Sequence, residues 1–94
     1  MRLTVDGDQI TDRSMLHDLL AEALHFPAYY GRNLDALYDM LSSTSKETVI
    51  CIRNQEQLGV HLGTYAEGFF EVLRDASLEN PALQICFENK DQEV

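Results

Sequence analysis

The chain has 94 residues, and its 7 Lys and Arg stand against 16 Asp and Glu, which gives a formal net charge of −9. A chain of this length forms one domain, and its hydrophobic content of 45% is enough for one core. The acidic balance argues against binding to nucleic acids or anionic membranes, because both require a basic face. It favours a basic protein partner, or it serves only to keep the protein in solution.

Residues 3–5 predict a short first strand, which a glycine-containing turn follows. Thr11 or Asp12 can cap a first amphipathic helix, which ends before Pro27 because the residue before a proline avoids helical geometry. Asn33 is a good N-cap for a second amphipathic helix, which ends in a serine-rich turn. The first half of the chain therefore predicts one strand and two helices.

The second half predicts two strands and two helices. Residues 48–52 are a continuous apolar, β-branched run, which is typical of a strand covered on both faces or nearly so. Asn54 can cap a short third helix that stops at Gly63, and residues 64–67 have the pattern of a capping box for a fourth helix. Residues 83–87 predict the last strand.

This β-α-α-β-α-α-β order predicts a parallel sheet with right-handed crossovers. If both crossovers lie on one face, the strand order is 1-2-3, and the domain is a two-layer α/β fold with three strands and about four helices. That arrangement leaves one sheet face poorly covered, which conflicts with the apolar second strand. We expect a single domain over residues 1–94, with 89–94 as a polar tail.

The cysteines and histidines indicate neither an exported protein nor a metal site. The N-terminus lacks the pattern of a signal peptide, and no apolar stretch is long enough to span a membrane. Cys51 and Cys86 lie in apolar runs, so we expect them to be reduced, buried core residues of a cytoplasmic protein. His17, His25 and His61 are scattered without metal-ligand spacing, so we expect no metal and no cofactor.

Two carboxylates lie one turn apart on the second predicted helix. Asp35 and Asp39 share an exposed face, with Tyr29 and Tyr38 nearby, while Tyr30 is expected in the core. The pattern fits a solvated helix face or a surface that binds a cationic partner. A catalytic dyad would need two different environments, and neither a pocket nor a nucleophile constellation is predicted, so we do not expect an enzyme.

A second acidic row follows the fourth predicted helix at intervals of four residues. It consists of Glu67, Glu71, Asp75 and Glu79. Like charges at this spacing repel each other, and a basic partner would relieve the repulsion. The row also fits a solvated face in which Arg74 offsets part of the charge.

Residues 29–39, YYGRNLDALYD, resemble the signature of the barstar family, the intracellular inhibitors of barnase-type ribonucleases. The resemblance extends over roughly residues 1–88. It implies a three-stranded parallel sheet with helices packed on it, and an inhibitor whose second helix and preceding loop plug the active site of the ribonuclease. In this role Asp39 would sit among the basic catalytic residues in place of a substrate phosphate, and Asp35 would pair with a further arginine.

The resemblance implies a set of partner-binding residues that spans the loop, the second helix and the end of the fourth helix. They are Tyr29, Asn33, Leu34, Asp35, Tyr38, Asp39, Ser43, Thr44, Asp75 and Glu79. Three positions depart from the family pattern, because Tyr38 and Thr44 stand where tryptophans occur and Lys46 replaces an acidic residue. These departures concern the identity of the partner more than the mode of binding.

We therefore expect a one-to-one protein inhibitor of a basic, extracellular-type ribonuclease, which acts in the cytoplasm and protects the producing cell. An alternative is a barstar-like binding module or immunity protein for a different basic toxin or a regulatory target. A third class, a hydrolase that uses Asp35 and Asp39, would show turnover by the purified protein alone.

Overall fold

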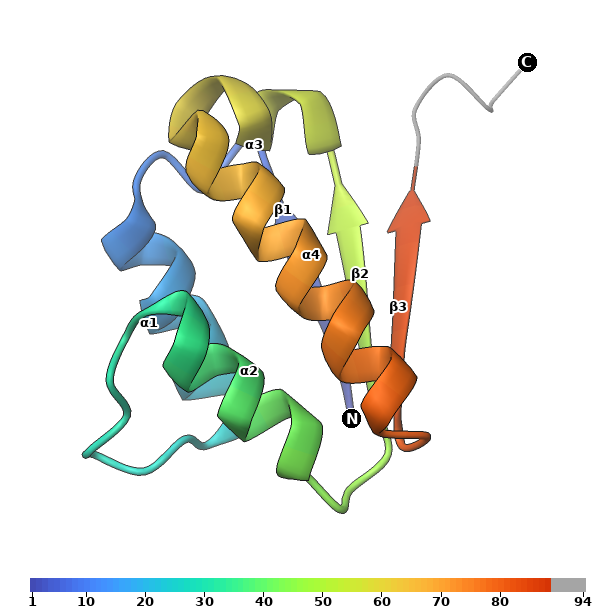
Figure 1. Cartoon of the computed structure of the whole chain (residues 1–94). Helices are drawn as coiled ribbons and strands as arrows, with labels where there is room; N and C mark the ends of the chain where they lie inside the picture. Colours follow the sequence, from blue (N-terminus) through green and yellow to red (C-terminus); the bar gives the residue numbers. More distant parts are fainter. Residues whose placement is uncertain (89–94) are drawn as a thin grey trace.

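The computed structural model describes residues 1–88, so the predicted polar tail at 89–94 lies outside the described residues. The elements are β1 (Arg2–Asp6), α1 (Arg13–Leu24), α2 (Leu34–Ser43), β2 (Thr48–Arg53), α3 (Gln55–Leu62), α4 (Thr64–Glu79) and β3 (Leu83–Glu88) (Figure 1). The predicted order of elements is confirmed. Each observed strand end matches the predicted end or lies one residue beyond it, which is the usual uncertainty of element boundaries.

The sheet is parallel and its strand order is β1-β2-β3, as the handedness argument predicts. Leu3 pairs with Ile50, which in turn pairs with Ile85, and this row faces the helices. The burial of β1 alternates strictly, with Leu3 and Val5 buried and Arg2 and Thr4 exposed. A period of two means that one face of the sheet carries the core and the other does not.

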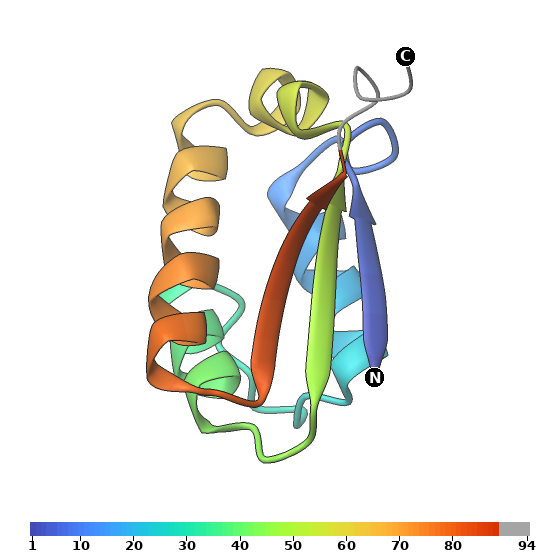
Figure 2. The same cartoon turned by 90° about the vertical axis from the view of Figure 1, so that its right-hand side faces the viewer.

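The helices supply the second layer of the fold. Figure 2 shows α1, α2 and α4 on one side of the sheet, while α3 lies beyond the ends of the strands. The core between the layers includes Leu16, Leu37, Phe69 and Leu73, none of which is exposed. The two-layer architecture predicted from the sequence is therefore confirmed.

The prediction for the cysteines, which lie on the open face of the sheet, is wrong. The sequence predicts reduced thiols, but Cys51 and Cys86 form a disulfide between directly paired positions of β2 and β3, with their Cα atoms 4.5 Å apart. Cys51 is fully buried and Cys86 is half-buried. On the same face Glu88 forms ion pairs with Arg53, at 3.3 Å, and with Arg2, at 3.9 Å. The apolar run of β2 thus needs no second layer of helices above it.

Asn54 directly precedes α3, as predicted, but the side-chain caps expected for the third and fourth helices are wrong. Asn54 has left-handed backbone geometry (φ 53°), and its amide donates to Asp6 Oδ1 at 2.7 Å instead of capping α3. Gly63 (φ 61°) ends α3, as predicted, and also precedes the first residue of α4, so Thr64 lies inside the helix. The direct α3–α4 junction leaves no extended residue that could act as a side-chain cap.

Candidate protein-binding surface

The α2 helix begins where its sequence predicts. Asn33 is in extended conformation, and its Oδ1 accepts a hydrogen bond from the backbone N–H of Ala36 at 2.8 Å. One residue earlier, Arg32 has left-handed geometry (φ 55°), and its guanidinium pairs with Asp18 of α1 at 2.7 Å. It also donates to the backbone oxygen of Ser14 at 3.2 Å. The start of α2 is therefore fixed against α1.

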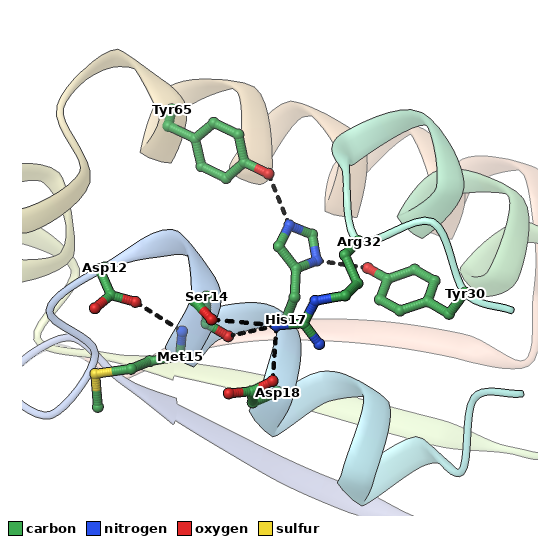
Figure 3. Close-up of polar contacts among 8 residues, drawn as sticks. All are labelled: Asp12, Ser14, Met15, His17, Asp18, Tyr30, Arg32 and Tyr65. Carbon is green, nitrogen blue, oxygen red and sulfur yellow. Dashed lines mark hydrogen bonds and ion pairs between the residues drawn. The ribbon is translucent and has the colours of Figure 1, made fainter. Parts of the chain in front are cut away.

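A buried histidine anchors the same loop from inside. His17 of α1 is only 2% exposed, and its Nδ1 hydrogen-bonds to Tyr30 Oη at 2.6 Å while its Nε2 hydrogen-bonds to Tyr65 Oη at 2.7 Å (Figure 3). The three rings come from α1, the loop before α2 and the first turn of α4. The expected core position of Tyr30 is confirmed, since it is 6% exposed. No local pattern in the sequence indicates this cluster, because Tyr30 and Tyr65 lie 13 and 48 residues from His17.

The protonation states in this cluster follow from burial. Burial lowers the pKa of His17, the nearby Arg32 charge lowers it further, and Asp18 partly opposes this change. Burial raises the pKa of Tyr30 to about 12, with a smaller contribution from Tyr65. A neutral imidazole has one donor and one acceptor, so one phenol donates to the ring and the other accepts from it. The hydrogen bonds of the cluster therefore form while all three side chains are uncharged.

The exposed face of α2 carries both predicted aspartates. Asp35 and Asp39 are exposed, whereas Leu37 and Leu41 of the same helix are buried against the core. Tyr29 precedes them on the loop and is 82% exposed, which is unusual for a large ring. The structure therefore presents two carboxylates and one aromatic ring to solvent on adjoining segments.

The other predicted residues of α2 are less accessible. Tyr38 and Leu34 are half-buried and pack against the core. A Cβ added to Gly68 of α4 would lie 2.8 Å from Leu34 Cδ1, which shows how closely α2 packs on α4. At the end of α2, Ser43 is exposed and its Oγ donates to the backbone oxygen of Asp39 at 2.6 Å. Thr44 is half-buried and ends the helix.

The C-terminal ends of α2 and α4 meet. Asn80 directly follows α4, and its Nδ2 donates to the backbone oxygens of Leu41, at 2.9 Å, and Thr44, at 2.8 Å. Asp75 and Glu79, on the last turns of α4, are both exposed, and Asp75 lies 3.7 Å from the Arg74 guanidinium. The structure thus brings the acidic end of α4 beside the end of α2, and Figure 1 shows the two helices side by side.

A cleft of about 360 Å³ lies at the C-terminal end of α2, and neither Asp35 nor Asp39 lines it. Its lining includes Phe26, Pro27, Met40, Ser43, Thr44 and Lys46. Within residues 1–88, no group of three or more His, Cys, Asp or Glu side chains could hold a metal ion. No helix in that part of the chain is long and apolar enough to cross a membrane. The two aspartates lie on an open surface, which suits contact with a cationic partner.

Comparisons with known proteins agree with the resemblance seen in residues 29–39. The family model described as "Barstar (barnase inhibitor)" matches residues 1–90. The chain is also 38% identical, over 79 residues, to a protein of Bacillus subtilis (strain 168) named "Putative ribonuclease inhibitor YrdF". That alignment covers 83% of this chain and 87% of the Bacillus protein.

Proposed function

Because this chain belongs to the Barstar family of barnase inhibitors, we propose that it inhibits a basic, extracellular-type ribonuclease by covering the active site with the exposed face of α2. The observation that carries the proposal is the pair Asp35 and Asp39, which project together from a helix face that the fold leaves open. The inhibitor binds one to one and blocks access of RNA. It performs no chemistry of its own, in keeping with a family of inhibitors.

Asp39 is the proposed anchor. A ribonuclease binds its substrate phosphate with cationic side chains, and a carboxylate can take the phosphate's place because arginine binds both groups through two parallel hydrogen bonds. Asp35, one turn earlier, would pair with a further arginine. Buried charges are stable only when they are matched, so the loss of one carboxylate would leave a partner cation buried and unpaired.

The surrounding residues supply contact area and orientation. Tyr29, exposed and aromatic, is suited to pack on the partner, while Asn33 and Tyr38 border the aspartates. A standard interface covers about 800 Å² per partner, which is roughly one seventh of the 5868 Å² surface of this chain. The loop, α2 and the end of α4, with Leu34, Ser43, Thr44, Asp75 and Glu79, can supply that area.

Lys46 is the observation that favours an alternative partner. It is exposed at the rim of the cleft, and among residues 1–88 it is the one Lys or Arg without an ion pair or a stacked ring. A cation at this position favours a partner that presents an acidic group opposite it. The alternative function is therefore a barstar-like immunity protein for a different basic toxin, or a binding module for a regulatory target, with the same α2 surface.

The test is inhibition of RNA cleavage by barnase and by other small basic ribonucleases. Wild-type protein should inhibit at least one of them stoichiometrically. Asp39→Asn should bind that enzyme roughly 30- to 5,000-fold more weakly, a range for buried charge pairs to which the barnase–barstar complex itself has contributed. As a control, Glu56→Gln removes one negative charge from an exposed position of α3 and should change the affinity less than about twofold.

Two results would contradict the proposal. Equal inhibition by wild type and Asp39→Asn would show that the aspartate is not the anchor. RNA hydrolysis by the purified protein alone would show an enzyme. We place the inhibitor in the cytoplasm of the producing cell, where it would protect cellular RNA before the ribonuclease is exported.

A further inference from the structure

We infer that Asn80 is a positioning residue for the partner-binding surface: it locks the end of α2, which carries Ser43 and Thr44, to the end of α4, which carries Asp75 and Glu79. This inference rests on the proposed function. Neither the acidic pattern nor the family signature indicates Asn80. The residue is buried, with only 7% of its surface exposed.

Every polar group of Asn80 has a partner within the fold. Its Nδ2 donates to the backbone oxygens of Leu41 and Thr44, and its Oδ1 accepts from the backbone N–H of Ala82 at 3.0 Å. Its own N–H donates to the Ala76 oxygen at 2.9 Å, and its backbone oxygen accepts from Leu83 at 3.0 Å. Two carbonyls on one side and one N–H on the other fix the orientation of the amide.

The geometry explains why the end of α2 needs this support. The last carbonyls of a helix have no partner within the helix. Thr44, which directly follows α2, is extended, so the left-handed residue that would satisfy these carbonyls is missing. The last turn of α2 also contains no basic side chain. Asn80 supplies donors to two of these oxygens from a residue 36 to 39 positions away in the chain.

The same junction reaches the sheet. Ala82, which donates to the Asn80 side chain, accepts a hydrogen bond from Thr48 at the start of β2, at 2.8 Å. The α2–β2 and α4–β3 connections therefore meet at one end of the molecule, as Figure 1 shows. Because surface loops are ordinarily the mobile part of a domain, fixing both connections limits the conformations in which Thr44 and Glu79 meet a partner.

A rigid surface binds more tightly because less conformational entropy is lost on association. Removal of the Asn80 amide would take away the hydrogen bonds to Leu41 and Thr44, so it should loosen the end of α2 more than the rest of the fold. The two halves of the surface would then no longer be presented in a single arrangement. Asn80 is buried and reaches Thr44 through the backbone oxygen of that residue, so its effect on binding would run through the backbone of α2.

The first experiment needs no partner. Amide hydrogen exchange is measured on wild type, Asn80→Ala and Val5→Ala, the last being a core truncation in β1 on the far strand. For Asn80→Ala we expect exchange in the last turn of α2 to accelerate at least about tenfold more than exchange in β1. Val5→Ala should accelerate exchange in both regions equally. Equal acceleration in Asn80→Ala would overturn the inference.

The second experiment measures binding to the ribonuclease that wild type inhibits, with barnase as the first probe. Asn80→Ala should dissociate about tenfold faster than wild type, and also faster than Val5→Ala when denaturation shows equal loss of stability. In double variants, Asn80→Ala should be non-additive with Ser43→Ala and additive with Tyr29→Ala, which lies at the other end of the surface. Additivity in both pairs, or dissociation equal to that of Val5→Ala, would overturn the inference. If wild type inhibits no ribonuclease, the proposed function fails, whereas the exchange experiment still decides whether Asn80 locks α2.

Discussion

Mild acid should destabilise this protein through one buried side chain, His17. The ring is 2% exposed and lies between two phenols, Tyr30 and Tyr65, at 2.6 and 2.7 Å. Burial and the neighbouring Arg32 guanidinium lower the pKa of His17 below its usual 6.5, and the Asp18 carboxylate only partly offsets them. Arg13 stacks on the Tyr65 ring, 4.4 Å from its centroid, so a second cation lies near the cluster. Within residues 1–88, both ring nitrogens are hydrogen-bonded to phenols and neither to a carboxylate, so an added proton would be poorly compensated.

The sign of the effect follows from proton binding. Because the pKa of His17 is lower in the folded protein, the unfolded chain takes up the proton at higher pH and binds more protons near and below pH 6.5. The stability that is present above pH 6.5 is therefore lost as the pH falls toward the lowered pKa of the folded state. The slope from one such group is at most about 1.4 kcal/mol per pH unit. The loss at pH 5.5 is therefore at most about 1.4 kcal/mol.

The assay is urea unfolding followed by circular dichroism at pH 7.5, 6.5 and 5.5. His17→Gln removes the titrating group while keeping one donor and one acceptor for the phenols, so it isolates the contribution of the ring from that of the carboxylates. Wild type should lose more stability than His17→Gln between the two extremes, by at most about 1.4 kcal/mol. His25→Gln, at an exposed histidine, should follow wild type. Parallel pH profiles for wild type and His17→Gln would refute the reasoning.

Three further outcomes are expected. Gly7→Ala should destabilise the fold by about 2 kcal/mol or more in urea unfolding, because the new Cβ would collide with the Asn54 backbone oxygen and lie 2.6 Å from the Leu58 nitrogen; unchanged stability would contradict this close packing. Reduction of the Cys51–Cys86 disulfide, which joins residues 35 apart, should lower the free energy of unfolding by about 4 kcal/mol, because the unfolded chain gains loop entropy. An unfolding midpoint that is the same with and without dithiothreitol would contradict the presence of the disulfide. The association rate with an inhibited ribonuclease should fall between low and physiological salt in stopped-flow measurements, and a constant rate would exclude electrostatic steering by the charge of −9.

Local patterns in the sequence determined the order of elements and the face of α2 that lies open. A helix turns about 100° per residue, so the apolar spacing of Leu37 and Leu41 was sufficient to place Asp35 and Asp39 on the opposite, exposed side. The strand order also followed from the sequence, because right-handed crossovers on one face allow only β1-β2-β3. These properties depend on residues within a few turns of one another, or on the handedness of the chain.

Tertiary structure alone decided the contacts that join distant segments. The His17 cluster, the disulfide of Cys51 with Cys86 and the reach of Asn80 to α2 link residues from 13 to 48 positions apart. No period in the sequence encodes such pairs, since they depend on the register of the strands and on how closely the helices pack. The acidic composition indicated a basic partner, and the periodicity of α2 placed Asp35 and Asp39 on its exposed face. Only packing determines whether the loop before α2, α2 itself and the end of α4 form one surface.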